Sequence, residues 1–377
     1  MVIVIDAINI RGGGGVTHLV ELLKEAEPSF FGFKKIYVCA TKKTNEKIED
    51  KPWLIKYNNN FFEQGTIARF FWQIFFLNKF LKKNKCDLLF VPGGTYLGCW
   101  KPFVTMSQNL LPFEWKELTR YGVSKMFFKM IFLKLTQTYT FNKANGVIFL
   151  TSYAQEIVKK QIKNNINSTI VAHGINKRFE NLPKLQYSIN DYSPKNPLKI
   201  LYISSIDVYK HQDHVIEAVS ILHKEGYPVL LELVGPAHPE PLRKMNKLID
   251  KLDPQKDFVI YYGSMPYESL DNMYKNSDIF LFASSCETFG QIVTEAMSAG
   301  LPIACSKKSA LPDVLGDAGI YFDPEDSSDI ALALKTLILN PELRTKIAIT
   351  GYKRSKEYSW NKSANETFSF LSNFTKY

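Results

Sequence analysis

The sequence predicts an α/β protein of two domains, each built on a doubly wound parallel sheet and facing the other across a cleft. Three observations favour this fold. Its 377 residues exceed the roughly 100–200 that one domain usually holds. Short apolar runs alternate with amphipathic segments along the chain, as strands and helices of parallel sheets do. A polar stretch with three prolines, 181–197, separates two such series and is expected to be a linker.

The first half begins as strand, glycine loop and helix. Val2–Ile8 is apolar, Arg11–Gly15 contains four glycines, and Val16–Lys24 has apolar residues at helical spacing. The first run lacks a basic segment before it and a small-residue cleavage site after it, so we expect a buried strand and no signal peptide. The other elements predicted in this half are strands at Lys35–Thr41, Cys86–Pro92, Lys101–Ser107 and Gly146–Leu150, and a helix at Ser152–Lys163.

The second half repeats the alternation. Its predicted strands are Leu198–Ser204, Val229–Val234, Val259–Tyr262, Ile279–Phe282 and Pro302–Ala304. Its predicted helices are Asp213–Lys224, Arg243–Leu252, Gly290–Ser298, 327–339 and 342–357. We therefore expect domains at 1–183 and 184–357, with 358–377 forming a C-terminal helix that packs back on the first domain. In such sheets ligands bind beyond the carboxyl ends of the strands.

Charge is distributed unevenly along the chain. Residues 1–186 hold 27 Lys and Arg against 13 Asp and Glu, a net charge of +14, while the remainder has a net charge of −4. A basic surface suits nucleic acid or anionic lipid, although a composition rich in Lys and Asn can also follow from AT-rich coding. No nucleic-acid recognition motif accompanies the charge, so we expect no nucleic-acid partner.

The five cysteines and the apolar runs bear on location. No cysteine pair is spaced as CxxC, and an odd number argues against a disulfide framework, which predicts reduced thiols. No run of about 18 apolar residues occurs, so no membrane-spanning segment is predicted. We expect a cytoplasmic protein.

The strongest functional pattern follows the strand that ends at residue 282. Glu287 lies in the loop, and Glu295 lies about two turns into the next helix. The backbone N–H groups of Phe289, Gly290 and Gln291 at the start of that helix suit an anion, and glycine lets a ligand approach closely. Carboxylates beside an anion site suit hydroxyl groups rather than phosphate. These residues predict a ligand with phosphate in its middle and hydroxyls at both ends.

This segment resembles a known signature. Glu287 and Glu295, the Phe-Gly pair between them, and the following Ala-Met-Ser-Ala-Gly-Leu-Pro are similar to the motif of the retaining glycosyltransferases of family 4. The resemblance implies the GT-B fold of two Rossmann-like domains and a nucleotide-diphosphate sugar as co-substrate. It also implies transfer of a hexose-type sugar, with its anomeric configuration kept, to a growing surface glycan. Bacterial O-antigen, lipopolysaccharide and capsule enzymes look similar, which implies an acceptor on a lipid diphosphate carrier.

The same resemblance assigns roles to residues. Lys210 matches the lysine of the family's Gly-Arg-x4-Lys segment, which binds the donor diphosphate, and Ser205 stands where the family usually has arginine. Glu287 would bind sugar hydroxyls and Glu295 the ribose, so Glu287 and Lys210 are the expected catalytic residues. The expected donor-binding set is Gly14, Gly15, Ser205, Lys210, Glu287, Phe289, Gly290, Gln291 and Glu295.

Three residues of the first domain are candidates for the sugar and acceptor side. Many family members carry a histidine where this chain has Gln108 and Asn109, and an amide cannot act as a general base at neutral pH. This fits a mechanism in which the departing phosphate takes the acceptor proton and the protein supplies position and charge. His173 replaces an asparagine in the segment that closes the first domain; it either faces the sugar or caps a turn.

No cofactor is expected. No Asp-x-Asp motif and no cluster of His and Cys with metal-ligand spacing is found, so we predict no obligatory metal. The second strand ends in Cys39-Ala40-Thr41 without the acid that a dinucleotide-binding unit needs for its ribose, which disfavours a dehydrogenase.

Two segments of the first half mix aromatic and basic residues. Thr66–Lys85 and Tyr121–Lys143 are rich in Phe and Lys, a composition that suits a membrane surface. The alternative is that both are core helices with solvated lysines. The first reading predicts a peripheral protein on the inner face of the cytoplasmic membrane.

Two other functions remain open. One is a nucleotide-sugar epimerase on the same fold, which would need acid and base side chains in its cleft. The other is a catalytically weak sugar-nucleotide-binding relative, because Ser205 removes one cation. Hydrolysis of the donor without acceptor would separate this last possibility from an enzyme.

Overall fold

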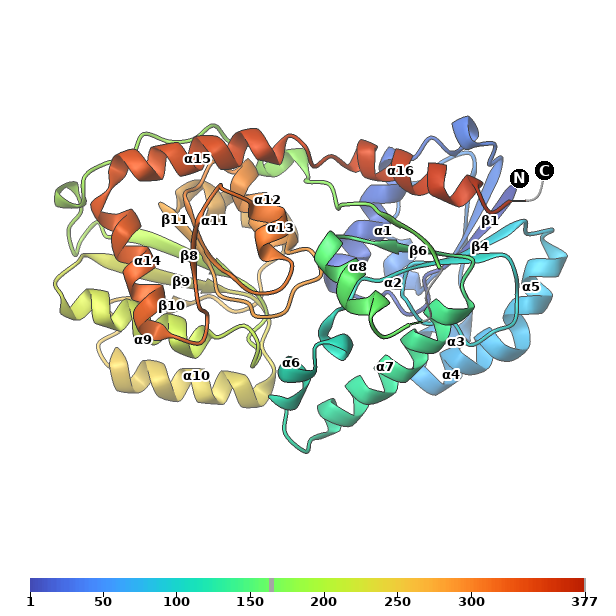
Figure 1. The fold of residues 1–377 in the computed structure, drawn as a ribbon, viewed down its shortest axis with the longest axis horizontal. Helices are drawn as coiled ribbons and strands as arrows, with labels where there is room; N and C mark the ends of the chain where they lie inside the picture. Colours follow the sequence, from blue (N-terminus) through green and yellow to red (C-terminus); the bar gives the residue numbers. More distant parts are fainter. Residues whose placement is uncertain (163–165, 376–377) are drawn as a thin grey trace. The chain divides into compact units, whose positions relative to one another are not determined.

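The computed structural model describes residues 1–162 and 166–375. The chain divides into two compact units, Met1–Gly174 with Ser359–Tyr377, and Ile175–Tyr358. Each unit has one parallel sheet with helices packed around it (Figure 1). No helix within the described ranges is long and apolar enough to cross a bilayer.

The first unit contains a seven-stranded sheet in the order β3-β2-β1-β4-β5-β6-β7. All its neighbouring strands run parallel. The chain order reverses between β1 and β4, so the loops that follow these two strands diverge, and such a point is where doubly wound sheets bind ligands. The strands are β1 (Val2–Asp6), β2 (Lys35–Cys39), β3 (Leu54–Tyr57), β4 (Leu88–Val91), β5 (Phe103–Met106), β6 (Gly146–Phe149) and β7 (Asn167–Ile170).

The helices of the first unit include one from the far end of the chain. The C-terminal helix α16 (Trp360–Ser372) packs on α1 (Gly13–Glu25). Its Phe368 ring lies 6.1 Å from the ring of Phe33. The others are η1 (Pro28–Phe31), α2 (Lys42–Asn45), α3 (Asn60–Glu63), α4 (Thr66–Phe71), the π-helix η2 (Trp72–Phe76), α5 (Leu77–Lys83), η3 (Leu111–Phe113), α6 (Trp115–Thr119), α7 (Lys125–Lys143) and α8 (Ser152–Lys159).

The second unit contains a six-stranded parallel sheet in the order β10-β9-β8-β11-β12-β13. Its chain order reverses between β8 and β11. The strands are β8 (Leu198–Ile203), β9 (Val229–Val234), β10 (Val259–Tyr261), β11 (Ile279–Phe282), β12 (Ile303–Ser306) and β13 (Ile320–Phe322). The helices are η4 (Lys177–Phe179), η5 (Ile189–Asp191), α9 (Gln212–Lys224), α10 (Pro239–Leu252), η6 (Tyr267–Ser269), α11 (Leu270–Asn276), α12 (Gln291–Ser298), α13 (Leu311–Leu315), α14 (Ser327–Leu339) and α15 (Pro341–Ser355).

The strands that the sequence analysis missed, β3, β7 and β13, all lie at the edges of their sheets. An edge strand has only one neighbour and is partly exposed, so it lacks the continuous apolar run by which buried parallel strands are recognised. β7 shows this directly, because its residues Asn-Ser-Thr-Ile are all at least partly exposed. By contrast, β11 is fully buried and has the predicted bounds.

The first domain ends earlier than predicted. We expected the boundary after residue 183, but residues from Ile175 onward belong to the second unit. Phe179 is fully buried in the core of that unit, and its ring lies 5.4 Å from the rings of Tyr267 and Tyr274. The polar stretch 181–197 therefore lies inside the second unit and does not separate the two.

Arg344 anchors part of that stretch. It is fully buried in α15, and its Nη1 donates to the carbonyl oxygens of Leu337 (2.6 Å) and Ile338 (2.9 Å) at the end of α14. Its Nε donates to Gln186 Oε1 at 2.9 Å, and its Nη2 donates to the carbonyl of Tyr187. One guanidinium thus satisfies the last carbonyls of a helix and holds the segment before β8.

We expect Arg344→Met to lower the free energy of unfolding of the second unit by about 3 kcal/mol. The change leaves several buried carbonyl oxygens without a donor, and each such group is costly. Urea unfolding measures the effect. Lys346→Met, at an exposed position of the same helix, serves as the control and should change stability little. Equal stability of the two variants would contradict this role of Arg344.

Candidate active site

The central pair of the second unit joins two loops that leave neighbouring strands. Lys210 follows β8, Glu287 follows β11, and these strands are paired in the sheet. The Lys210 Nζ donates to Glu287 Oε1 in an ion pair that is mostly shielded from solvent. The sheet therefore brings together, at the reversal of its strand order, the two residues for which the sequence predicted catalytic roles.

Lys210 is held in a charged state. Its ammonium lies 5.2 Å from the centre of the Phe282 ring and 4.8 Å from that of Tyr209. The Tyr202 hydroxyl donates to its carbonyl oxygen. Burial by itself would lower the pKa of Lys210, but Glu287 together with Tyr202 and Cys286 outweighs burial and the pKa is raised. Lys210 can therefore present a permanent positive charge to an anionic ligand.

The backbone of Glu287 is fixed by Ser309. The Glu287 N–H donates to Ser309 Oγ at 3.0 Å, and that hydroxyl donates back to the Glu287 carbonyl at 2.8 Å. Three residues later Gly290 adopts φ +84°, and a Cβ there would lie 2.7 Å from Leu311 Cδ2. Glycine is thus required where the chain turns into α12, and no side chain caps that helix.

The two residues beside Gly290 differ in environment. The Phe289 side chain is buried, with its ring 5.6 Å from that of Tyr358, so it packs in the core and only its backbone is available for the predicted donor contact. The Gln291 Nε2 is buried without a hydrogen-bond partner. The side-chain amide of Gln291 can therefore still donate to a ligand at the start of α12.

Glu295 is buried and held by two tyrosines. Tyr267 OH donates to its Oε1 and Tyr274 OH to its Oε2, both at 3.0 Å. Burial raises the pKa of Glu295 to about 7, although both tyrosine hydroxyls oppose the shift. The sequence analysis missed Tyr267 and Tyr274, which come from η6 and α11. Each carboxylate oxygen can accept a further bond, so these tyrosines orient Glu295 without excluding a hydroxyl ligand.

Ser205, which replaces the usual arginine, lies in a tight backbone crossing after β8. The Gln212 Nε2 donates to Ser204 Oγ and to the Ser205 carbonyl, both at 2.9 Å. A Cβ on Gly235 would lie 2.0 Å from the Ser204 carbonyl oxygen. The Ser205 backbone is thus fixed by Gln212 from the start of α9.

His211, which directly follows Lys210, is buried and only 2% exposed. It caps α9 with φ +50°, and its Nε2 lies 2.9 Å from Ser285 Oγ. The Ser285 N–H donates to the Tyr209 carbonyl at 2.9 Å. Two contacts therefore join the Lys210 loop to the Glu287 loop.

In the first unit, Gly14 and Gly15 lie in the first turn of α1, which begins three residues earlier than predicted. A Cβ on Gly15 would lie 3.3 Å from Gln108 Oε1, and the Gln108 Nε2 is 3.2 Å from His18 Nδ1. Asn109 Oδ1 accepts the Leu111 N–H at 3.1 Å. Gln108 thus lies beside the glycine turn, whereas Asn109 stabilises its own loop.

His173 packs inside the first unit. Its ring centroid lies 4.8 Å from that of His18 and 5.5 Å from that of Trp360, which begins α16. All three side chains are buried. Sequence reasoning missed His18, which is not among the apolar residues at helical spacing in Val16–Lys24.

We expect acid to destabilise the first unit through His18. Burial lowers the pKa of His18 from 6.5 to about 4, so below pH 6.5 the unfolded chain binds a proton that the folded chain does not. Stability from this group is complete above pH 6.5 and falls by about 3 kcal/mol as the pH drops to 4. Urea unfolding at several pH values should show a smaller decrease for His18→Leu than for wild type. His238→Leu, at an exposed site, should behave as wild type; an unchanged pH dependence in His18→Leu would contradict the prediction.

Comparison with known proteins identifies the second unit. Residues 188–354 match the family described as Glycosyl transferases group 1. This segment is a glycosyltransferase domain. It contains Lys210, Glu287 and Glu295, so the three residues singled out from the sequence belong to the matched domain.

Curated relatives of the glycosyltransferase domain include two bacterial mannosyltransferases. The chain is 26% identical over 196 residues to O-antigen chain mannosyltransferase B of Escherichia coli, covering 47% of this chain and 50% of the relative. It is 26% identical over 276 residues to the serotype-specific mannosyltransferase WbdA of Escherichia coli, covering 71% of this chain and 32% of the relative. The chain thus spans half or less of these relatives' lengths.

Solved structures resemble the chain over nearly its whole length. Sucrose-phosphate synthase from Thermosynechococcus elongatus has a TM-score of 0.77 at 15% identity, with 99% of this chain and 98% of that chain covered. Anabaena HepE in complex with UDP and glucose has a TM-score of 0.72 at 16% identity, with 98% and 99% covered. WaaG, a glycosyltransferase involved in lipopolysaccharide biosynthesis, has a TM-score of 0.70 at 15% identity, with 98% and 99% covered. These likenesses confirm the predicted two-domain GT-B fold.

Proposed function

We propose that this chain transfers a hexose-type sugar from a nucleotide-diphosphate donor to a growing bacterial surface glycan, with retention of anomeric configuration. The buried Lys210–Glu287 pair carries the proposal. It places a cation beside a carboxylate that can accept hydrogen bonds from hydroxyl groups, at the edge of the sheet where the ligands of such domains bind. The relatives that act on O-antigen support the acceptor class, and the HepE complex supports a sugar-nucleotide donor.

A bound donor would break the ion pair between Lys210 and Glu287. Lys210 would turn to the diphosphate as a point charge, and the released Glu287 carboxylate would accept hydrogen bonds from sugar hydroxyls. The N–H groups at Gly290 and Gln291 would face the phosphate oxygens, and Glu295 would bind the ribose. Lys210 thereby exchanges one anionic partner for another, and Glu287 exchanges the ammonium group for neutral hydroxyl donors.

The proposed reaction needs no side-chain base. The bond between the anomeric carbon and the diphosphate oxygen breaks through an oxocarbenium-like state, and the acceptor oxygen attacks the same face. The acceptor proton passes to the departing phosphate oxygen. Gln108 and Asn109 are amides and take no part in proton transfer, so Lys210 and the start of α12 act by stabilising negative charge. We also propose that no metal ion is required, and chelator-treated enzyme should keep its activity.

The acceptor is proposed to lie on a lipid diphosphate at the inner face of the cytoplasmic membrane. Phe128, Phe132, Leu135 and Tyr139 form a stripe along α7 at spacings of four, three and four residues, and each is between 48 and 65% exposed. Such a stripe is an apolar face of α7 that does not pack against the rest of the protein. Lys125 and Lys129 flank it and are exposed, as expected for contact with anionic lipid.

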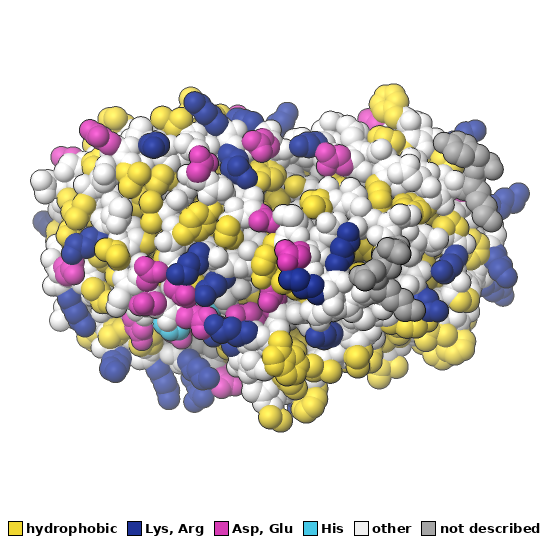
Figure 2. Space-filling model, in the orientation of Figure 1, with side chains coloured by type: hydrophobic (Ala, Val, Ile, Leu, Met, Phe, Trp, Pro, Cys, Tyr) yellow, Lys and Arg dark blue, Asp and Glu magenta, His cyan; other side chains and the backbone are white. Residues whose placement is uncertain are grey.

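A second helix extends the exposed apolar area. The Phe70 ring of α4 lies 5.9 Å from the Phe132 ring of α7, and Phe71, Ile74 and Phe75 beside it are exposed. Figure 2 shows hydrophobic side chains gathered along the lower edge of the first unit, over α4 and α7. We call Phe71, Ile74, Phe75, Phe128, Phe132, Leu135 and Tyr139 the aromatic surface.

The part of the aromatic surface that lies on α4 and η2 is attached to the sheet through Gln73. Gln73, in the π-helix η2, donates its Nε2 to Asp6 Oδ2 at 2.7 Å and to the Thr95 carbonyl at 3.2 Å. This fixes the buried side of the segment to the ends of the sheet and leaves Ile74 and Phe75 pointing outward. The exposed aromatics are thus on a rigid support, as a surface for a bilayer requires.

A panel of donors tests the function. We expect one nucleotide series among UDP, GDP and ADP sugars to raise the melting temperature of the full chain, by an amount equivalent to about 2.7 kcal/mol at a hundred times its Kd. Slow release of that nucleoside diphosphate without acceptor should follow, which a catalytically weak relative would not show. An epimerase would convert the sugar without releasing nucleotide. If no sugar nucleotide stabilises the chain, the proposal fails.

A further inference from the structure

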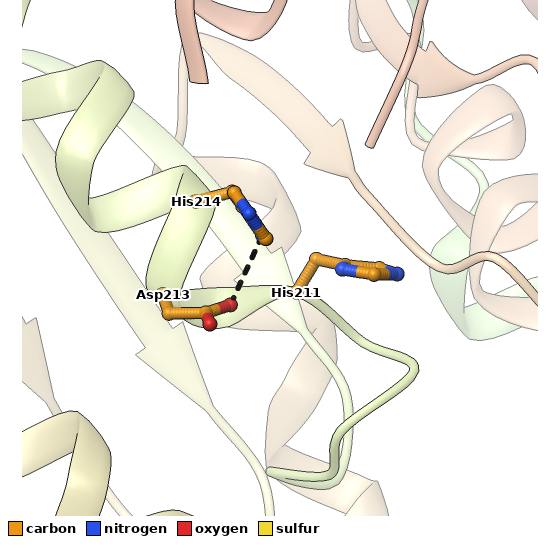
Figure 3. A group of neighbouring side chains, drawn as sticks. All are labelled: His211, Asp213 and His214. Carbon is orange, nitrogen blue, oxygen red and sulfur yellow. Dashed lines mark ion pairs between the residues drawn. The ribbon is translucent and has the colours of Figure 1, made fainter. Parts of the chain in front are cut away.

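We infer that the N-terminus of α9 is a binding site for zinc or a similar divalent transition-metal ion. Within the described ranges, His211, Asp213 and His214 are the one group of at least three His, Cys, Asp or Glu side chains that could share an ion, and their ligand atoms all lie within 4.8 Å of one another (Figure 3). Two imidazoles and a carboxylate match the ligands that zinc uses in open sites with three protein ligands. The sequence did not predict this group, because it combines His with Asp, whereas the expected metal motifs were Asp-x-Asp and clusters of His and Cys.

Helix geometry explains why these side chains meet. His211 is the N-cap of α9 and His214 is the third residue of the helix, so the two are three positions apart and lie on the same side of its first turn. The ring centroids of these two histidines lie 5.4 Å apart. His211 is buried and oriented by the contact of its Nε2 with Ser285 Oγ, as ligand histidines commonly are by an outer partner.

The third ligand can adjust to an ion. Asp213 Oδ1 already lies 3.3 Å from His214 Nδ1, close to the separation of about 3.4 Å between ligands around a tetrahedral zinc. The Asp213 side chain is mostly exposed and that of His214 about one-third exposed, so both can rotate toward His211. A solvent molecule can complete the coordination.

Charge around the group favours a cation. Besides Asp213, the acids Glu217 and Glu325 act on His214, and their attraction contributes to raising its pKa. The helix dipole places a partial positive charge at the start of α9, which disfavours a cation. The negative charges of Asp213, Glu217 and Glu325 are larger than this partial charge. Imidazole ligands select zinc, copper or nickel over magnesium, which prefers oxygen.

An ion here would be coupled to the donor site, a step that rests on the proposed function. Lys210 directly precedes His211, and Ser285 is two residues before Glu287. An ion that holds His211 would also hold its contact with Ser285, and so would keep the two active-site loops from adjusting to the donor. Zinc is therefore expected to inhibit transfer, in an enzyme that needs no metal to work.

Direct metal binding tests the site without any donor or activity. Cobalt, a spectroscopic stand-in for zinc, should bind the full chain saturably and give the visible absorption of tetrahedral coordination, and zinc should displace it while magnesium should not. Asp213→Asn and His214→Ala should abolish this binding, and Ser285→Ala should weaken it about tenfold. His238→Ala, at an exposed histidine outside the group, should bind as wild type. The inference is overturned if wild type gives no such signal, or if Asp213→Asn and His214→Ala bind cobalt as wild type does, which would leave only an ion pair.

A second measurement tests whether metal binding affects donor turnover, independently of whether the metal site exists. Zinc should lower donor turnover of wild type, whereas His214→Ala, with unchanged turnover in chelator, should resist zinc. Saturable cobalt binding together with zinc-insensitive turnover would refute the coupling and leave the site. If no donor turns over at all, the cobalt titration still decides the site, so failure of the proposed function is distinguished from failure of this inference.

Discussion

Lys210→Ala is expected to lower the kcat of the proposed sugar transfer by about 10²–10³-fold, the cost of removing one preorganised group that stabilises a developing charge. In this chain the loss is expected at the upper end of that range, because Ser205 stands where a second cation would otherwise share the diphosphate charge. The variant also leaves Glu287 without its ion-pair partner. Release of nucleoside diphosphate in the presence of acceptor measures the effect.

Two further variants show whether the loss is specific. Lys308→Ala removes a lysine of the same unit whose ion pair with Asp323 is at the surface, and it should keep full activity. Glu287→Gln should also lower kcat strongly, and combining it with Lys210→Ala should add little, because both residues serve one site. Circular dichroism should show the fold of each variant unchanged. A Lys210→Ala enzyme with near-normal turnover would exclude the proposed role of this lysine.

The triple variant Phe128→Ser, Phe132→Ser and Leu135→Ser is expected to release the chain from anionic vesicles. Each of these side chains is at least half exposed, and burying one fully in an apolar phase is worth about 1.5–3 kcal/mol. Even half of that gain over three residues changes the partition coefficient by about 50-fold or more. Flotation with vesicles of phosphatidylglycerol and phosphatidylethanolamine measures the bound fraction.

Matched leucines of the second unit provide the control for membrane binding. Leu332 and Leu339 on α14 are 62% and 52% exposed, and changing both to serine should leave vesicle binding unchanged. Hydrolysis of a soluble donor should be the same in the triple variant as in wild type, since no residue of the donor site is altered. Vesicle binding that survives the triple substitution would contradict a membrane role for the aromatic surface.

The sequence predicts the second unit better than the first, for a physical reason. Its buried parallel strands are short apolar runs, and Lys210 and Glu287 lie in the loops that follow two of them. The loop that holds Glu287 comes after β11, so its position at the ligand edge follows from local order alone. The edge strand β13 carries a weaker signal, because it has only three residues and two of them are partly exposed.

Contacts between distant residues could not be predicted. Tyr267 and Tyr274 hold Glu295 from 28 and 21 positions away, and nothing in their own surroundings marks them as partners of a carboxylate. The burial of His211 depends in the same way on Ser285, 74 positions away in the chain. Patterns of spacing report which face of an element is apolar, but they do not report which element covers it.

The second unit is one uninterrupted stretch of chain inserted into the first, since the first is completed only by Ser359–Tyr377. The insertion leaves and rejoins its host at adjoining points, because a Cβ on Gly174 would lie 2.1 Å from the Trp360 backbone nitrogen. A few residues could therefore bridge the excision, and each half could be produced as a separate recombinant piece. A chain that ends before α16 would lack the helix that packs on α1. Truncation at the C-terminus is therefore expected to destabilise the first unit, although most of that unit comes from the N-terminal part of the chain.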